Sequence, residues 1–125
     1  MMAAEIRIKR IYEAADAADG FRVLVDRLWP RGISKERAAL SDWWKDIAPS
    51  PELRTWFGHK AEHFDEFAEK YRVELVTGDA APARMRTVAE HLAAGENVTL
   101  LYGAKSPEIN HARVLRDWMV EMMDK

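Results

Sequence analysis

The segment FRVLVDRLWPRG, residues 21–32, is the most informative part of the chain. Its apolar run Val23–Val25 is short, rich in β-branched residues and without helical period, which predicts a strand buried on both faces. Polar and aromatic side chains follow this run directly: Asp26, Arg27, Trp29 and Arg31. Ligands of open α/β sheets bind outside the carboxyl ends of the strands, so the segment predicts the floor of a binding site. A salt-bridged structural corner is the alternative.

The residues after this apolar run determine the path of the chain beyond the strand. Trp29 precedes Pro30, and a residue before proline is pushed out of the helical region into extended geometry. Gly32 then allows a sharp turn. We therefore expect a rigid strand that presents its polar side chains on an irregular loop.

Length and composition limit the class of protein. The chain has 125 residues, which fits a single domain over 1–125. It has no cysteine, which excludes disulfides, thiolate metal sites and cysteine nucleophiles. We expect no membrane span and, because Met1–Glu5 lacks a basic and then apolar leader, no secretion signal. A cytoplasmic protein is expected, and the formal net charge of −2 argues against nucleic acid as a partner.

Two further segments predict strands that pair with the first. Residues 5–9 alternate polar and apolar side chains, and Val98–Tyr102 is a second unalternating apolar run. We expect a small α/β domain with strands Ile6–Ile11, Arg22–Asp26 and Val98–Tyr102 in one largely parallel sheet of three to four strands. Helices should cover both of its faces.

Helix signals fill the segments between these strands. Ser34 predicts a cap for a short helix over 35–40, and Ser50-Pro51-Glu52 predicts a helix that runs to Phe57. Further helices are expected over 61–76, after Asp79, and after the repeated Ser-Pro-Glu at 106–108. The pair Trp43-Trp44 should roof the sheet or cover an interface.

Polar residues also follow the second apolar strand. They are Tyr102, Lys105, Asn110 and His111. If the two strands are parallel neighbours, both polar clusters meet at one edge of the sheet. Arg27, Arg31 and Lys105 then suit a phosphate or carboxylate, and Asp26 with His111 suits proton transfer.

The four histidines are not equivalent. His111 lies on the apolar stripe of the last predicted helix, which fits a satisfied core histidine and a proton carrier or metal ligand equally well. His59 follows Trp56-Phe57-Gly58 at a helix break, beside aromatic surface. His63 and His91 fall on helix surfaces.

Four motifs give the sequence a family resemblance. They are RVLVDRLWPRG (22–32), APSPELRTWFGH (48–59), VTLLY (98–102) and NHA (110–112). They closely resemble bacterial proteins grouped as domain of unknown function 488, and the resemblance covers nearly the whole chain. It implies a small cytosolic α/β protein, with non-covalent haem binding in a dimer for some members. This sequence departs from the expected pattern at Gly103, where alanine is expected, and at Lys105-Ser106-Pro107.

Three functions are consistent with these residues. The first is a small-ligand protein, most specifically one that binds b-type haem, with His59 as the first-choice iron ligand and His111 as the second. Porphyrin and propionate contacts would come from the residues Arg27, Arg31, Trp29, Trp56, Phe57, Tyr102, Lys105 and Asn110.

The second function is an enzyme for an anionic, nucleotide-like small substrate. It would use Asp26 and His111 as acid and base, with Arg27, Arg31 and Lys105 as the anion clamp. The third is a regulatory or interaction module. Five tryptophans exceed what so small a sheet needs for packing, so a homodimer through tryptophan-rich surface is also expected.

Overall fold

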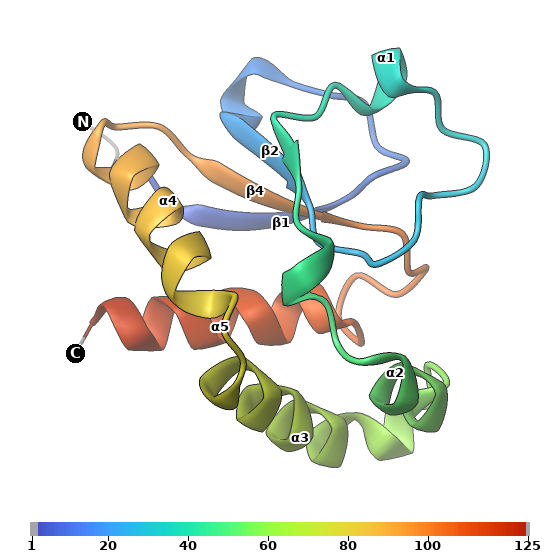
Figure 1. The fold of residues 1–125 in the computed structure, drawn as a ribbon. Helices are drawn as coiled ribbons and strands as arrows, with labels where there is room; N and C mark the ends of the chain where they lie inside the picture. Colours follow the sequence, from blue (N-terminus) through green and yellow to red (C-terminus); the bar gives the residue numbers. More distant parts are fainter. Residues whose placement is uncertain (1–2, 125) are drawn as a thin grey trace.

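The protein is described by a computed structural model for residues 3–124. One four-stranded parallel sheet has the strand order β1-β4-β2-β3 (Figure 1). Its strands are β1 (Ile6–Arg10), β2 (Phe21–Leu24), β3 (Asp42–Trp43) and β4 (Val98–Tyr102). The predicted parallel α/β sheet is confirmed. The two-residue strand β3 was not predicted; it contains Trp43, one of the pair expected to roof the sheet or cover an interface.

β4 is central and buried along its whole length, which explains its unalternating apolar sequence. Leu100 lies opposite Ile8 of β1 on one side and opposite Val23 of β2 on the other. Alternate residues of these strands point to opposite faces, so both faces of the sheet need an apolar cover.

Five α-helices and three short 3-10 helices accompany the sheet in the described part of the chain. The α-helices are α1 (Lys35–Ala38), α2 (Pro51–Phe57), α3 (Phe64–Thr77), α4 (Ala81–Ala93) and α5 (His111–Met123). The 3-10 helices are η1 (Ala17–Asp19), η2 (Lys45–Ile47) and η3 (Ala61–His63). Within residues 3–124, no helix is long and apolar enough to cross a membrane.

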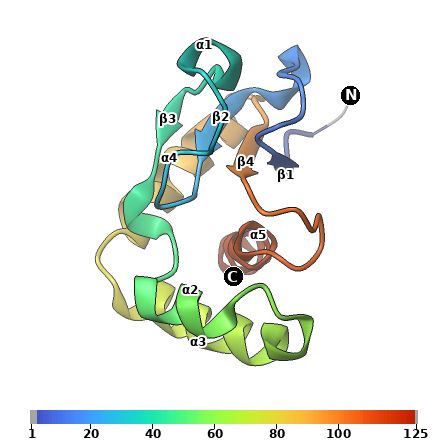
Figure 2. The same ribbon diagram turned by 90° about the vertical axis from the view of Figure 1, so that its right-hand side faces the viewer.

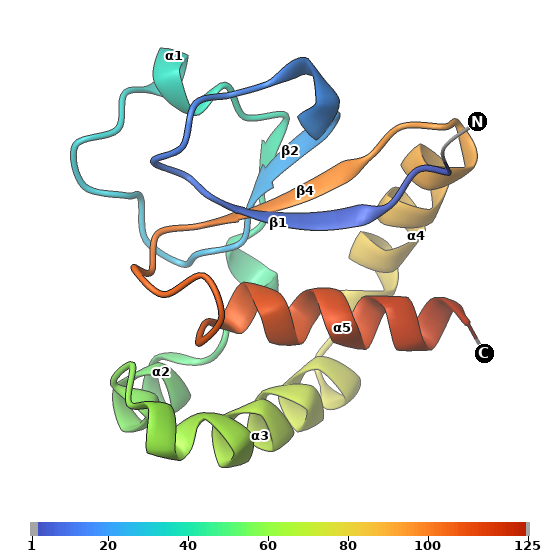
Figure 3. The ribbon, with the colours of Figure 1, turned by 180° about the vertical axis from the view of Figure 1, so that it is seen from behind.

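The helices form layers of unequal depth on the two faces. α5 lies between the sheet and the α2–α3 pair, as the view nearly along its axis shows (Figure 2). The reverse view shows α5 running beneath β1 (Figure 3). The short helix α1 covers the opposite face, where Ala38 packs with Leu24 and Leu101.

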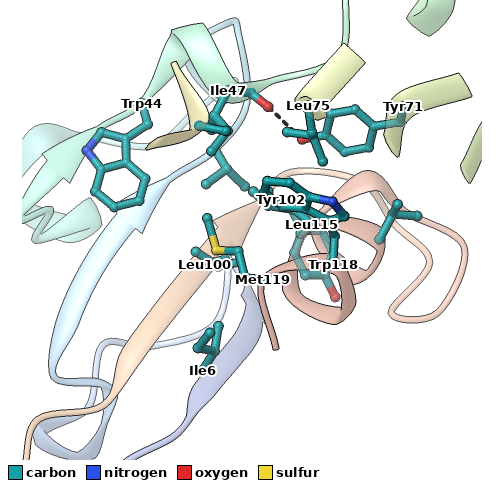
Figure 4. Packing of buried hydrophobic residues seen from close by; sticks show 14 of the residues in the cluster. Ile6, Trp44, Ile47, Tyr71, Leu75, Leu100, Tyr102, Leu115, Trp118 and Met119 are labelled. Atoms are coloured by element: carbon teal, nitrogen blue, oxygen red, sulfur yellow. Dashed lines mark hydrogen bonds between the residues drawn. The ribbon is translucent and has the colours of Figure 1, made fainter. Parts of the chain in front are cut away.

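The larger core fills the space between the sheet and the thicker helical layer (Figure 4). Leu100 and Tyr102 from β4 pack here with Leu115 and Met119 from α5. The hydroxyl of buried Tyr71 in α3 donates to the carbonyl oxygen of Ile47 at 2.6 Å. This hydrogen bond fixes the segment that leads from η2 into α2.

One strand residue is charged and buried. Arg22 lies in β2, and its Nη1 is 2.6 Å from Oδ2 of Asp19. Lys9 also approaches this carboxylate, at 3.1 Å, and Arg22 Nη2 donates to the carbonyl oxygen of Ala38 at 2.7 Å. Because Arg22 is paired and hydrogen-bonded, β2 can carry it inside the sheet and use it to hold α1.

The helix start predicted at Ser50 is confirmed, since its Oγ accepts from the N–H of Leu53 at 3.2 Å. The start predicted at Ser106 is wrong. Ser106 accepts from the N–H of Ile109 in a local turn, and α5 begins only after Asn110, whose side chain accepts from the N–H of Arg113. Residues 50–52 and 106–108 have the same sequence, Ser-Pro-Glu, but only the first begins a helix. The hydrogen bond from Arg113 to the side chain of Asn110 sets the start of α5. Asp79 also does not cap α4, which starts after Ala80 with no side-chain cap.

Candidate functional site

A cavity of about 230 Å³ lies at the carboxyl end of the sheet. Its walls come from the segments after β2 and β4, the first residue of α5, the segment before α2, and α2 and α3. The side chains that carry charge or an imidazole are Asp26, Arg27, Arg54, His59 and His111. Most other lining residues are apolar or small, including Leu28, Ala48, Pro49, Phe57, Phe67, Gly103 and Ala104.

His111 connects the start of α5 to the end of β2. Its Nε2 lies 2.9 Å from the carbonyl oxygen of Val25 and 3.1 Å from Oδ1 of Asp26. Hydrogen-bond geometry is satisfied between Nε2 and the Val25 oxygen but not between Nε2 and Asp26. The contact with Asp26 is therefore a close approach, which is an ion pair only when the imidazole is protonated. Because a carbonyl oxygen can only accept, Nε2 carries the proton.

Asp26 is left with unused acceptor capacity. Its Oδ2 accepts from the N–H of Gly103 at 2.8 Å, whereas Oδ1 is buried without a hydrogen-bond partner. A carboxylate has about four lone-pair positions, and this hydrogen bond occupies one of them. Gly103 leaves room for the carboxylate, since a Cβ there would lie 3.1 Å from Oδ2.

Two arginines line the cavity without a carboxylate partner. Arg27 donates from Nη2 to the carbonyl oxygens of Ala48 and Pro49 at 3.2 and 3.3 Å, and its buried Nε has no partner. Arg54 is exposed on α2, and its side chain makes no ion pair or hydrogen bond within residues 3–124. The only buried, unpartnered side-chain nitrogen and oxygen atoms of the described residues are Nε of Arg27 and Oδ1 of Asp26. Such atoms in a native fold call for a ligand, an ion or water.

Tyr71 holds the segment that leads into the lining residues Ala48 and Pro49. Burial raises the pKa of the Tyr71 hydroxyl well above its usual value, and the nearby carboxylates of Glu74 and Asp26 raise it further, while Arg27 acts in the opposite direction. The hydroxyl therefore stays protonated and donates to Ile47, directly before the lining residues Ala48 and Pro49.

The structure brings together some of the residues singled out in the sequence. Asp26, Arg27, Phe57, His59, Asn110 and His111 all line the cavity. The amide of Asn110 is already engaged, since it accepts from the N–H of Arg113 and donates to the carbonyl oxygen of Ser106 at 2.9 Å each. Its role is to cap α5.

The other singled-out residues lie outside the cavity lining. Trp29 packs on the α1 face, where its Nε1 donates to the carbonyl oxygen of Ile33. Tyr102 is buried in the main core, and Trp56 stacks on His63. Arg31 and Lys105 are exposed, and neither lines the cavity. The loop after Asp26 carries Trp29 and Arg31 away from the cavity, and Tyr102 belongs to β4, where its side chain packs into the main core.

Arg54 was missed as a site residue by sequence reasoning. It lies within the segment 48–59 that carries the family resemblance, three positions before Phe57. The strongest signals in that segment are the helix start at Ser50 and the histidine at 59, and a single arginine on a short helix adds no functional signal of its own. The lining residues Leu28, Ala48, Pro49 and Phe67 carry no signal that separates them from ordinary core or loop residues.

The chemical repertoire of the cavity is narrow. Its lining contains carboxylate, guanidinium, imidazole and amide groups, and none of the lining residues carries a hydroxyl or thiol. In residues 3–124, no three histidine, aspartate or glutamate side chains gather closely enough to hold a metal ion. The arrangement can hold an anion with arginine and exchange hydrogen bonds with Asp26.

Haem fits this cavity poorly. Sites for drug-sized ligands usually measure about 300–1,000 Å³, and haem is larger than most such ligands, whereas the cavity measures about 230 Å³. Nε2 of His111 is committed to Val25 and has no lone pair for iron, and His59 is the other histidine in the cavity lining. His59 is exposed at the rim, in the left-handed region with φ of 60°, and the centre of its ring lies 5.9 Å from that of Phe57.

The tryptophans do not form a shared exposed surface. Trp44 and Trp118 are buried, Trp29 and Trp43 are partly buried, and Trp56 is exposed. Most of the indole surface is therefore used within one chain. The homodimer stays a prediction, without the tryptophan-rich surface on which it was based.

Comparison with known proteins assigns the family. Residues 5–125 match the model of a family described as the inactive DUF488-N3 subclade. The chain belongs to this family. It is 44% identical over 114 residues to the uncharacterized protein YeaO of Escherichia coli, which covers 91% of this chain and 96% of YeaO.

Mycobacterial relatives are similarly close. The uncharacterized proteins Rv3073c of Mycobacterium tuberculosis and Mb3100c of Mycobacterium bovis are each 44% identical over 110 residues, covering 88% of this chain and 89% of the relative. No solved structure matches the chain. The predicted membership of the DUF488 family is confirmed, and none of these relatives carries an activity in its name.

Proposed function

We propose that this protein binds a small anionic ligand in the cavity at the carboxyl end of its sheet, without transforming it. The observation that carries the proposal is the pair Arg27 and Arg54, which line one cavity and have no carboxylate partner. Guanidinium groups are the preferred partners of carboxylate and phosphate oxygens, which they bind through directed N–H donors. A ligand oxyanion would supply the acceptor that these arginines lack.

The size and lining of the cavity indicate the kind of ligand. A volume of about 230 Å³ suits a molecule smaller than a typical drug. Phe57, Phe67 and Leu28 give one part of the wall an apolar character. A compact anion, alone or on a short apolar body, matches both properties.

Binding is favoured over catalysis for two reasons. The family is described as inactive, and no residue in the lining offers a hydroxyl or thiol nucleophile. Asp26 and His111 lie close enough for an acid–base pair, but the Nε2 proton is directed to Val25. An acid–base enzyme is therefore the weaker alternative.

The test is a thermal denaturation series with sodium phosphate, at an ionic strength held constant with sodium chloride. A ligand at ten times its dissociation constant stabilises the folded state by about 1.4 kcal/mol, which raises the Tm of a domain of this size by roughly 5 °C. Arg54→Gln should abolish most of this rise, because it removes one of the two cations.

Arg31→Gln is the matched control. Arg31 is another exposed arginine without a side-chain partner in the described residues, and it lies outside the cavity lining. This variant should keep the full phosphate response. The proposal is overturned if phosphate raises the Tm of no protein in the series, or if both substitutions reduce the rise equally.

A further inference from the structure

The cavity contains a negative charge as well as two positive ones. Asp26 lines the same space as Arg27 and Arg54 but is paired with neither of them. It accepts one hydrogen bond, from the N–H of Gly103, and its Oδ1 accepts none. An anion held by the arginines therefore shares the cavity with a carboxylate that still has acceptor positions to fill.

We propose that the site selects oxyanions that carry their own proton, an inference that rests on the proposed anion binding. Oxygen atoms of the ligand accept from Arg27 and Arg54, and an O–H of the same ligand donates to the carboxylate of Asp26. The P–OH of a phosphoryl group and the hydroxyl of a 2-hydroxy carboxylate both meet this requirement. The arginines supply attraction, and Asp26 supplies selectivity.

The physical reason is that contact with Asp26 is favourable for a hydrogen-bond donor and unfavourable for a bare anionic oxygen. A carboxylate has acceptors and no donor, so it stabilises a ligand O–H and repels a bare oxygen atom. Sulfate has the same tetrahedral shape as phosphate but is fully deprotonated at neutral pH, whereas phosphate retains at least one proton. A ligand that cannot donate leaves the remaining acceptor positions of Asp26 unfilled, which lowers the affinity of that ligand by roughly tenfold to a hundredfold.

The decisive experiment compares phosphate with sulfate on the wild-type chain at pH 7 and constant ionic strength. Isothermal titration calorimetry should give a dissociation constant for phosphate at least tenfold below that for sulfate. A second pair, glycolate against acetate, distinguishes a 2-hydroxy carboxylate from a phosphoryl group as the ligand. Preference for glycolate identifies a carboxylate with a neighbouring hydroxyl, and preference within the phosphate pair alone identifies a phosphoryl group.

Asp26→Asn tests whether this residue is responsible. The amide can turn an N–H toward the ligand, so the variant should accept sulfate and phosphate within about threefold of each other. Asp65→Asn is the matched control, because Asp65 is exposed on α3 and lies outside the cavity lining. It should keep the preference of the wild type. Circular dichroism of both variants verifies that they are folded.

The outcomes separate this inference from the proposal on which it rests. Equal binding of phosphate and sulfate by the wild type, together with equal binding of glycolate and acetate, overturns the selectivity and leaves anion binding intact. Absence of any binding, with all four probes, overturns both. Because the wild-type comparison is sufficient for the selectivity itself, the inference stays testable even if Asp26→Asn does not fold.

Discussion

His111 donates from Nε2 to the carbonyl oxygen of Val25 across 2.9 Å, which ties the first residue of α5 to the end of β2. The two residues are 86 positions apart in the sequence. This hydrogen bond holds two walls of the cavity together and at the same time fixes the tautomer of the imidazole. One contact therefore sets both the shape of the cavity and the availability of the histidine proton.

Removal of this contact should cost stability. In His111→Ala, the Val25 carbonyl loses its side-chain donor and the ring edge contact with Tyr71 disappears. The free energy of unfolding should fall by roughly 1–3 kcal/mol, measured by urea denaturation. His59→Ala is the control, since the imidazole of His59 makes no hydrogen bond within residues 3–124. Equal stability of the two variants would contradict this role for His111.

The buried pair Asp19 and Arg22 predicts a pH dependence of stability. Burial alone would raise the pKa of Asp19, but hydrogen bonds from the Asp16 N–H, Lys9 and Arg22 outweigh burial and lower it from the usual 3.8. A lowered folded-state pKa means that the unfolded chain binds protons first as the pH falls. The stabilisation from Asp19 is thus present above about pH 4 and is lost as the pH drops through the folded-state pKa.

Asp19→Asn tests this contribution. The side chains of Asp19 and Arg22 are only 3% and 6% exposed, so loss of the carboxylate leaves a buried arginine without its counter-charge. At pH 7 the free energy of unfolding should fall by about 3–5 kcal/mol. In chemical denaturation, the gap between variant and wild type should narrow below pH 4. A gap that stays constant down to pH 2 would show that Asp19 is not the titrating group.

Gly103→Ala restores the residue expected from the family resemblance and should disturb the site with little effect on folding. The new Cβ would lie 3.1 Å from Oδ2 of Asp26, a distance that displaces the carboxylate by a few tenths of an ångström. We expect a stability change below about 1 kcal/mol, because the neighbour is a side chain that can move. Phosphate affinity should change at least threefold in calorimetry. An unchanged affinity would argue that Asp26 does not contact the ligand.

Haem binding has its own test. Because the cavity is small and His111 is committed to Val25, haemin added to the wild type should give no saturable one-to-one complex with a sharpened Soret band. Titration at micromolar protein with absorption spectroscopy measures this directly. A one-to-one complex that His59→Ala abolishes would instead establish His59 as the iron ligand and favour haem over the small anion.

The apolar runs of the sequence were enough to predict the α/β class and three of the four strands. Val23–Val25 and Val98–Tyr102 must be covered on both faces, and only central strands of a layered sheet offer that cover. The start of α2 was equally local, since Ser50 caps it with its own side chain. β3 escaped prediction because a two-residue strand has no period to detect.

The gathering of Asp26, Arg27 and His111 followed from a rule about parallel strands and from their position after two apolar runs. The exclusion of Arg31, Trp29 and Lys105 from the cavity did not follow from any local signal. These residues lie on the same two loops, and the path of each loop is set by contacts with distant parts of the chain, such as Tyr12 Oη donating to the carbonyl oxygen of Arg31.

Arg54 is the converse case, a residue that the sequence did not single out and that the tertiary structure brings to the cavity. Local sequence places it on an exposed turn of α2, where an arginine is ordinary. It becomes a candidate ligand contact because α2 docks beneath the sheet edge and brings it to the cavity that Arg27 also lines. Local propensity and apolar periodicity thus determined the class of the fold, three of the four strands and the start of α2. Long-range packing decided which charges share a cavity, because that depends on contacts between residues far apart in the chain.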